Sequence, residues 1–242
     1  MFTQTSYKNK AQTLLRLQTI LDHIITPIED IVYNYLGIDF GNTDYLDETI
    51  DIKQMAITFH SQNYENQYVA FNHGDYFQWT KKNDDNSVKD NLPKERMILN
   101  TSNQKESYEL ALFLASQENE LIDSIKFYAM SKENFSNNPL IKCDKIVIYY
   151  KKKHRQAILN VISNYVKSTH IILKNNLSAF YDIFCDISTN AYVGIADEAD
   201  ASYSFTEFNR DCVLEAINAK CITPTDVFNY WCKKHGEKVI IK

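Results

Sequence analysis

The sequence has 242 residues, of which 44% are hydrophobic and 13% aromatic, and this is enough to form a core without disulfides or metals. The 26 basic and 31 acidic residues are spread along the chain and give a net charge of −5. This balance argues against nucleic acid or an anionic membrane surface as a partner.

The N-terminal part predicts amphipathic helices. Apolar residues recur at intervals of three and four from Leu14 to Tyr35, as on a helical face that packs against a core. Pro27 follows Thr26 and precedes Glu29, which is the pattern of a capped helix start. We therefore expect two helices here, or one sharply kinked helix.

The pattern changes to β after residue 41. The segments 50–60 and 67–79 predict strands, and Asn-His-Gly-Asp at 72–75 has the composition of a hairpin turn within the second. Residues 81–91 are polar and without periodicity, which predicts an exposed loop. A lid over a site would have the same composition.

Strands and helices alternate from residue 95 onward. Strands are expected at 96–100, 124–130 and 143–150, and helices at 103–120 and about 152–166. This alternation favours a mixed sheet with helices packed on it. The basic run 151–155 opens the second helix, either as a solvated face or as a surface that meets an acidic partner.

The stretch 191–217 combines a strand, an acidic loop and a helix start. Tyr192 to Ile195 is a short apolar run, and apolar residues from Phe205 to Ile217 recur at helical spacing. Because helix N-termini favour anions, this junction is a candidate place for a phosphate. Thr223 and Pro224 then predict a last helix to about residue 234, and 239–241 suit an edge strand.

These elements predict an α+β fold formed by residues 1–242 as a single domain. The N-terminal helices should pack on a mixed, largely antiparallel sheet, formed largely from residues 50–150 and joined by further helices. The apolar runs fall short of the roughly 20 residues that span a bilayer. The five Cys residues form no CxxC pair and suit buried thiols in a reducing compartment.

Motifs of metal and nucleotide chemistry are missing from the sequence. It contains no Ser/His/Asp order, Gly-rich phosphate loop or metal-spaced carboxylate set. Hydrolase, kinase and metalloenzyme functions are therefore weakly supported, and we expect neither a metal nor a cofactor.

Three segments between about residues 95 and 217 resemble the HopA-type effector family, which is founded on a type III secretion effector of plant-pathogenic bacteria. They read ERMILNTSNQKESYELALFLA, then IKFYAM through IKCDKIVIYYKK, and finally VGIADEADASYSF with CVLEAI. The first is similar to the family's basic residue, strand and helix, and the second to its Lys-bearing strand and its basic residue before an Asp. The third is similar to its Gly-containing strand, Ser-Phe-Gly segment and helix.

The third segment also departs from the family pattern. Where the family has Ser-Phe-Gly-x-His-Arg-Cys, this chain has Ser-Phe-Thr-Glu-Phe-Asn-Arg at 204–210. Arg210 lies one place past the family's Arg, and in a helix that shift turns a side chain by roughly 100°.

The resemblance implies two alternative functions. Domains of this type in peptide-modifying gene clusters are described as lyases that remove phosphate from phosphoserine or phosphothreonine by β-elimination. The alternative is a non-catalytic protein-binding module that retains the fold without the lyase site. In both cases the implied partner is a phosphorylated protein or peptide, with a secretion chaperone as a second partner. The implied location is the bacterial cytoplasm before secretion and then a host cell.

The resemblance also supplies candidate site residues. Lys126 is the candidate base for the α-proton, and the candidate phosphate ligands are Arg96, Lys142, Ser204 and Arg210. A Lys accepts a proton only where burial or neighbouring cations favour its neutral form. The alternative for Lys126 is an exposed strand residue between buried Ile125 and Phe127. The general acid remains open among six His and 16 Tyr residues.

Overall fold

A computed structural model describes residues 1–23, 28–40, 45, 68–73, 76–81, 94–117, 120–129, 141–198 and 204–236. The predicted strand at 50–60, the loop at 82–91 and the edge strand at 239–241 lie outside these ranges. The predicted cap residues Thr26 and Pro27 also lie outside them.

The centre of the fold is a sheet in which every described pairing is antiparallel. Eight strands are described, in the spatial order β1-β7-β8-β4-β6-β5-β3-β2. In that order their bounds are Phe2–Ser6, Asp182–Asp186, Ala191–Glu198, Lys94–Leu99, Ile146–Lys151, Ser124–Tyr128, Tyr76–Lys81 and Tyr68–His73. The predicted α+β class is thereby confirmed.

One detail of the expected sheet was wrong, because the described sheet is antiparallel rather than mixed. No parallel pair occurs among the described strands, because β6 lies between β4 and β5 and pairs antiparallel with both. The crossover from β4 through the following helix to β5 therefore passes over a strand. As expected, most of the described strands, β2 to β6, lie between about residues 50 and 150, and β1, β7 and β8 continue the sheet on the other side of β4.

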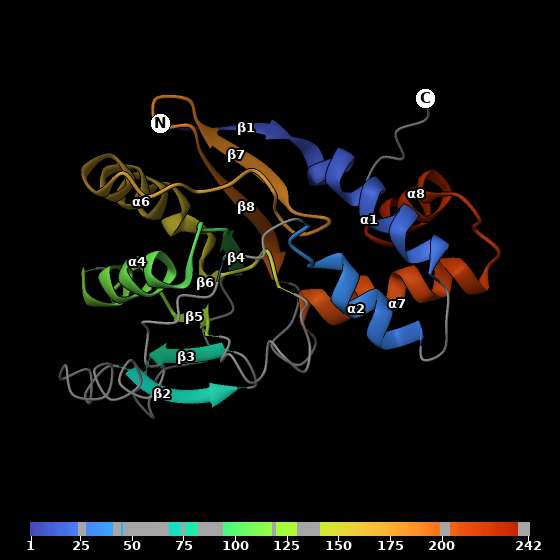
Figure 1. The fold of residues 1–242 in the computed structure, drawn as a ribbon, viewed down its shortest axis with the longest axis horizontal. Helices are drawn as coiled ribbons and strands as arrows, with labels where there is room; N and C mark the ends of the chain where they lie inside the picture. Colours follow the sequence, from blue (N-terminus) through green and yellow to red (C-terminus); the bar gives the residue numbers. More distant parts are fainter. Residues whose placement is uncertain are drawn as a thin grey trace.

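Helices cover both faces of this sheet (Figure 1). On one face lie α4 (Gln104–Gln117) and α6 (Arg155–Thr169), which bury a core with Met97, Ile125 and Ile148. On the other face lie α1 (Lys10–Asp22), α2 (Ile28–Leu36), α7 (Phe205–Asn218) and α8 (Pro224–Lys234). They bury a second core with Ile98, Val147 and Ala196. We call this second side the α1/α7 face.

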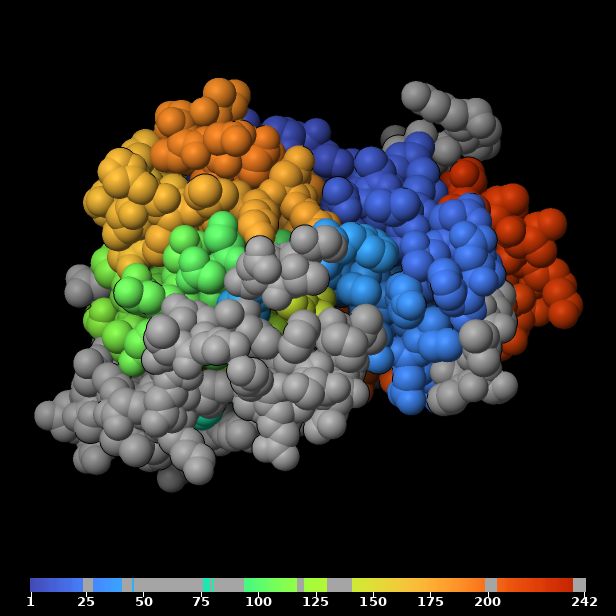
Figure 2. Space-filling model, in the orientation of Figure 1, coloured from blue at the N-terminus to red at the C-terminus, as the bar shows by residue number. Residues whose placement is uncertain are grey.

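The described apolar residues between Leu14 and Tyr35 lie on two helices, α1 and α2, as their spacing predicted. Leu17 and Ile20 on α1 and Val32 and Leu36 on α2 are buried in the core of the α1/α7 face. In Figure 2 these blue helices and the red C-terminal helices form one continuous surface. The hairpin predicted within 67–79 is also present, because β2 and β3 pair from Tyr68↔Lys81 to His73↔Tyr76.

Gly194 on β8 is a packing requirement of the α1/α7 face. A Cβ at this position would lie 2.7 Å from Ile98 Cγ1 and 3.1 Å from Tyr181 Cβ. We expect Gly194→Ala to destabilise the protein by about 1–3 kcal/mol, because overpacking a filled core forces backbone and side-chain shifts. Urea denaturation measures the change. A midpoint equal to that of the wild type would show that Ile98 moves aside without loss.

Candidate functional site

The sheet register places Lys126, Tyr149 and Arg96 on the α1/α7 face. Arg96 pairs directly with Tyr149, and Lys126 pairs with Val147, two residues before Tyr149. Residues paired across antiparallel strands share a face, as do residues two apart in a strand. α7, which Ser204 precedes, packs on the same face through Phe205. The Lys126 and Ser204 positions therefore lie on the same side of the sheet.

Lys126 lies among aromatic rings. Its Nζ is 5.3 Å from the centroid of Tyr149 and 5.9 Å from that of Tyr76. Both distances are within the range of a cation–π contact. No carboxylate of the described residues pairs with this half-buried ammonium group. Lys126 is therefore half-buried rather than exposed, whereas Ile125 and Phe127 are buried as the alternative interpretation expected.

Arg96 is buried beside Lys126 and is already paired. Only 4% of it is exposed, and its guanidinium makes a two-pronged ion pair with Glu198 on β8, with Nη2 2.8 Å from Oε1. Its Nη1 also lies 3.4 Å from Thr206 Oγ1 at the start of α7. The Arg96 Cζ is 5.1 Å from the centroid of Tyr149, so Arg96 and Lys126 both contact this ring. A phosphate that binds Arg96 must compete with Glu198.

Lys142 reaches the same region from the segment before β6. A β-bridge with Ile38 holds its backbone next to the end of α2. Its Nζ donates a hydrogen bond to Asn34 Oδ1 at 2.7 Å and lies 5.2 Å from the centroid of Tyr33. Its side chain therefore points along α2, away from the sheet core.

Asp144 connects the tyrosines of this site. It accepts a hydrogen bond from the Tyr76 phenol, and burial followed by Asp144 raises the Tyr76 pKa well above its ordinary value. Burial and then Asp144 also raise the pKa of Tyr33, which is 40% exposed. Both phenols are therefore protonated at neutral pH. The Tyr76 phenol donates to Asp144, and the Tyr33 residue is partly exposed to solvent. We call Lys126, Lys142, Asp144, Tyr33, Tyr76 and Tyr149, together with Arg96, the Lys126 site.

Ser204 and Arg210 have other partners. Ser204 is the N-cap of α7: its Oγ accepts from Glu207 N at 3.2 Å, and its own N–H donates to Glu207 Oε2 at 3.0 Å. The two hydrogen bonds from Ser204 lower the pKa of Glu207, so a negative charge occupies this helix start. Arg210 Nε lies 2.7 Å from Asp211 Oδ1. Their roles as phosphate ligands stay predictions.

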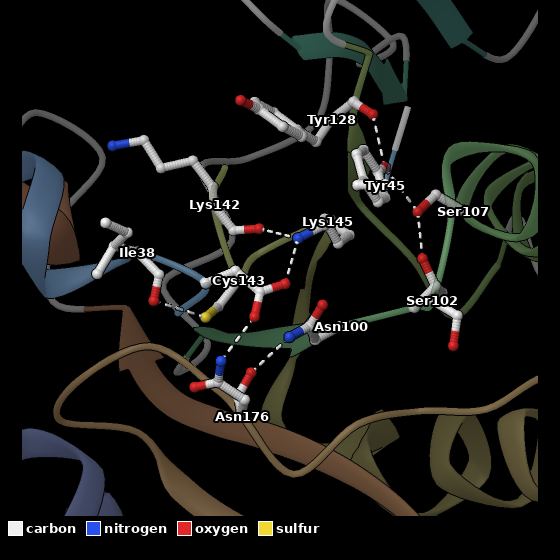
Figure 3. Close-up of polar contacts among 12 residues, drawn as sticks. Ile38, Tyr45, Asn100, Ser102, Ser107, Tyr128, Lys142, Cys143, Lys145 and Asn176 are labelled. Atoms are coloured by element: carbon white, nitrogen blue, oxygen red, sulfur yellow. Dashed lines mark hydrogen bonds and ion pairs between the residues drawn. The ribbon is translucent and has the colours of Figure 1, made fainter. Parts of the chain in front are cut away.

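A buried polar network lies behind Lys142 (Figure 3). Lys145 has none of its surface exposed, and its Nζ pairs with Asp39 Oδ2 at 2.8 Å. Asp39 in turn accepts from Asn176 Nδ2 at 2.6 Å, and the Lys142 carbonyl accepts from Lys145. Burial lowers the pKa of Lys145, and Asp39 opposes that shift. This network fixes the backbone from which Lys142 extends.

Sequence reasoning had left the general acid open, and the structure narrows the choice. Among the side chains that the structure describes, those of His23, His154, His170 and His235 contact other parts of the molecule or solvent, while Tyr33 and Tyr76 belong to the Lys126 site. His60 and the His73 side chain lie outside this description. The only signal for Tyr76 in the sequence was its place beside a predicted hairpin turn. Its pairing with β5 through Tyr128 could not be read from the sequence.

No family model and no curated protein matches the sequence. Two solved effector proteins are similar in structure. The effector protein from Pseudomonas syringae pv. syringae strain 61 has a TM-score of 0.57 at 10% identity, over 97% of this chain and 96% of that chain. The effector protein from Pseudomonas syringae pv. tomato strain DC3000 has a TM-score of 0.55 at 10% identity, over 95% and 96%. This chain has the fold of these two effector proteins.

The predicted resemblance is thus confirmed at the level of the fold. The type III effector/phosphothreonine lyase OspF from Shigella flexneri also matches, with a TM-score of 0.38 at 16% identity over 70% of this chain and 89% of that chain. An overlap at that score assigns no activity to this chain. Within the described ranges, no three His, Cys, Asp or Glu side chains gather as a metal site requires. None of the helices described is both long and apolar enough to cross a bilayer.

Proposed function

We propose that this effector-fold protein binds a phosphorylated segment of a partner protein at the Lys126 site and removes the phosphate by β-elimination. The supporting observation is the environment of Lys126. Its ammonium group faces Tyr149 and Tyr76, pairs with no carboxylate of the described residues, and shares the Tyr149 ring with Arg96. An amine in this setting can meet an anion or accept a proton without first breaking an ion pair.

The reaction needs a base, an acid and positive charge, and the site contains a candidate for each. In its neutral form Lys126 takes the α-proton of phosphoserine or phosphothreonine, and that electron pair forms the Cα=Cβ double bond. The Cβ–O bond breaks with its electrons leaving on phosphate, which the phenol of Tyr33 protonates, since the Tyr76 phenol already donates to Asp144. Lys142 and Arg96 hold the phosphate charge. The products are a dehydroamino acid and inorganic phosphate.

A second candidate function, a non-catalytic phosphoprotein-binding module, is favoured by two contacts. The Glu198 carboxylate binds the Nε and Nη2 donors of Arg96, which a phosphate would use, and Ser204 forms the capping box of α7. Binding through Lys126 and Lys142 alone would hold a phosphate but stabilise the transition state less.

A phosphopeptide mass assay separates the two functions. Incubation of the protein with a library of phosphoserine and phosphothreonine peptides should give products lighter by one phosphoric acid. Products lighter by the phosphate alone, with a hydroxyl restored, would indicate hydrolysis instead and contradict the lyase proposal. Peptide binding without any change in mass favours the binding module.

Glu198→Gln should increase the response of the protein to phosphate. The substitution keeps a hydrogen-bonding side chain beside Arg96 but removes the charge that competes with a bound anion. We expect a lower melting temperature without ligand, and a larger recovery in inorganic phosphate than the wild type shows. A ligand at about 100 times its Kd stabilises a protein by about 2.7 kcal/mol. Equal phosphate responses of variant and wild type would place the anion away from Arg96.

The effector fold also motivates a proposal about location. We place the protein in the bacterial cytoplasm before secretion and in a host cell afterwards, with a secretion chaperone as its partner in the first compartment. Fusion to a reporter that is active only in host cytosol tests delivery. Retention of the fusion in the bacterium under secreting conditions would oppose it.

A further inference from the structure

A small cavity lies beside the Lys126 site, in the core of the α1/α7 face. Its volume is about 20 Å³, and its lining includes Gly37 after α2, Asp144 before β6, Ser178, and Thr206 and Asn209 on α7. One water needs roughly 10–15 Å³ and two to four polar partners. The cavity is therefore large enough and polar enough for a single water.

Two polar atoms at this cavity have no partner in the protein. Asp144 Oδ1 and Ser178 Oγ are both buried, and neither atom forms a hydrogen bond within the protein. Ser178 as a whole is 6% exposed. Both face the same point. A Cβ built on Gly37 would lie 3.7 Å from Asp144 Oδ1 and 3.6 Å from Ser178 Oγ. A buried carboxylate oxygen and a buried hydroxyl left without partners are costly, so the geometry calls for a bridging group between them.

We infer that this cavity holds one ordered water that bridges Asp144 Oδ1 and Ser178 Oγ and fixes the Asp144 carboxylate against Tyr76. Asp144 is thereby a positioning residue. With one oxygen held by the water, the carboxylate presents the other to the Tyr76 phenol, whose ring lies 5.9 Å from Lys126 Nζ. The positioning part of the inference rests on the proposed function, whereas the water site does not.

Gly37→Ala tests the water directly, because the two alternatives predict opposite signs. The added methyl group meets only ordinary contacts, the nearest at 3.6 Å, and Gly37 does not adopt the left-handed conformation that would strain an Ala. In a dry cavity the methyl fills a void, and the lost freedom of the unfolded chain adds to stability, so the melting temperature rises. If the water is present, the methyl evicts it and leaves both atoms unpaired. We expect a fall of several degrees, and a rise would overturn the inference.

Ser178→Ala in two backgrounds provides a matched control. In the wild type the substitution removes one of the partners of the water, and the melting temperature should fall. In the Gly37→Ala background the water is already gone, so removing the unpaired hydroxyl should raise the melting temperature or leave it unchanged. Additive falls in the two backgrounds would mean that the residues act separately and that no water couples them.

Two further measurements test the presence of the water and its effect on Tyr76 separately. A crystal structure at high resolution should show density for the water in the wild type and none in Gly37→Ala. An empty wild-type cavity would overturn the inference. The ¹³Cζ resonance of Tyr76, assigned with Tyr76→Phe, reports the hydrogen bond of the phenol and should shift in Gly37→Ala. If the Tyr76 resonance shifts but the protein eliminates phosphate from no phosphopeptide, the water and its positioning of Asp144 stand and only the proposed lyase activity is refuted. An unchanged resonance would refute the positioning role alone.

Discussion

Asp39→Ala should destabilise the protein by about 3–5 kcal/mol, because it removes the carboxylate that pairs with the fully buried Lys145. Lys145 has no exposed surface, and Asp39 is 6% exposed. Loss of the carboxylate leaves the Lys145 ammonium to the Lys142 carbonyl and the Tyr45 ring, whose centroid is 4.4 Å away. Asn176 Nδ2 loses its acceptor in the same step. Guanidinium denaturation followed by circular dichroism measures the change.

A double variant distinguishes loss of the pair from loss of packing. Asp39→Ala combined with Lys145→Met removes both charges and keeps an apolar chain of similar length, so it should recover part of the lost stability. Glu109→Ala breaks an exposed pair with Lys105 at 3.9 Å and should change stability by less than about 1 kcal/mol. If Asp39→Ala costs no more than this surface control, Lys145 is neutral in the folded protein and the ion pair is absent.

The elements with long periodic patterns could be predicted from the sequence, and the short polar strands could not. The helices between Leu14 and Tyr35 follow from apolar residues at fixed spacing, which local sequence carries by itself. β1, with the sequence Phe-Thr-Gln-Thr-Ser, has one buried residue and four polar ones, so its strand character comes from pairing with β7. β7 has three apolar residues, Ile183, Phe184 and Cys185, but this run is too short to mark a strand locally, and its strand is set by pairing with β1 and β8.

The residues of the Lys126 site could in part be named from the sequence, but the strand pairing and side-chain contacts that bring them together could not. Lys126 and Arg96 could be named from the resemblance, while the face they share follows from the register of β4, β5 and β6, which is a long-range property. Glu198 lies 102 residues from Arg96, and no local pattern marks it as the partner. The buried network of Asp39, Lys145 and Asn176, which Arg16 joins through a hydrogen bond from its Nη2 to Asn176 Oδ1 at 2.9 Å, could not be predicted for the same reason. Each of its charged residues has the local sequence of an ordinary charged position.

Lys126→Ala should abolish phosphate elimination while leaving phosphopeptide binding largely intact. A general base contributes about 10²- to 10⁴-fold to a rate, and it acts in the transition state more than in the bound ground state. Lys142 and Arg96 remain to hold the phosphate. The measurements are the rate of phosphate release from a phosphopeptide and the Kd for the same peptide under non-turnover conditions. Lys105→Ala, on α4 and therefore on the opposite face of the sheet, is the control and should retain the wild-type rate.

Lys126→Arg decides what Lys126 contributes. The guanidinium keeps the positive charge beside Tyr149 and Tyr76 but does not release a proton at working pH, so a base role predicts an inactive variant. Activity in Lys126→Arg would assign Lys126 to charge stabilisation and leave a neutral group elsewhere in the site to take the proton. A wild type that binds phosphopeptides without eliminating phosphate would favour the binding module, and then Lys126→Ala should weaken binding itself. The ion pair of Glu198 with Arg96 would then be the physical reason that elimination fails. The Glu198 carboxylate neutralises the positive charge of Arg96, which is needed to stabilise the leaving phosphate.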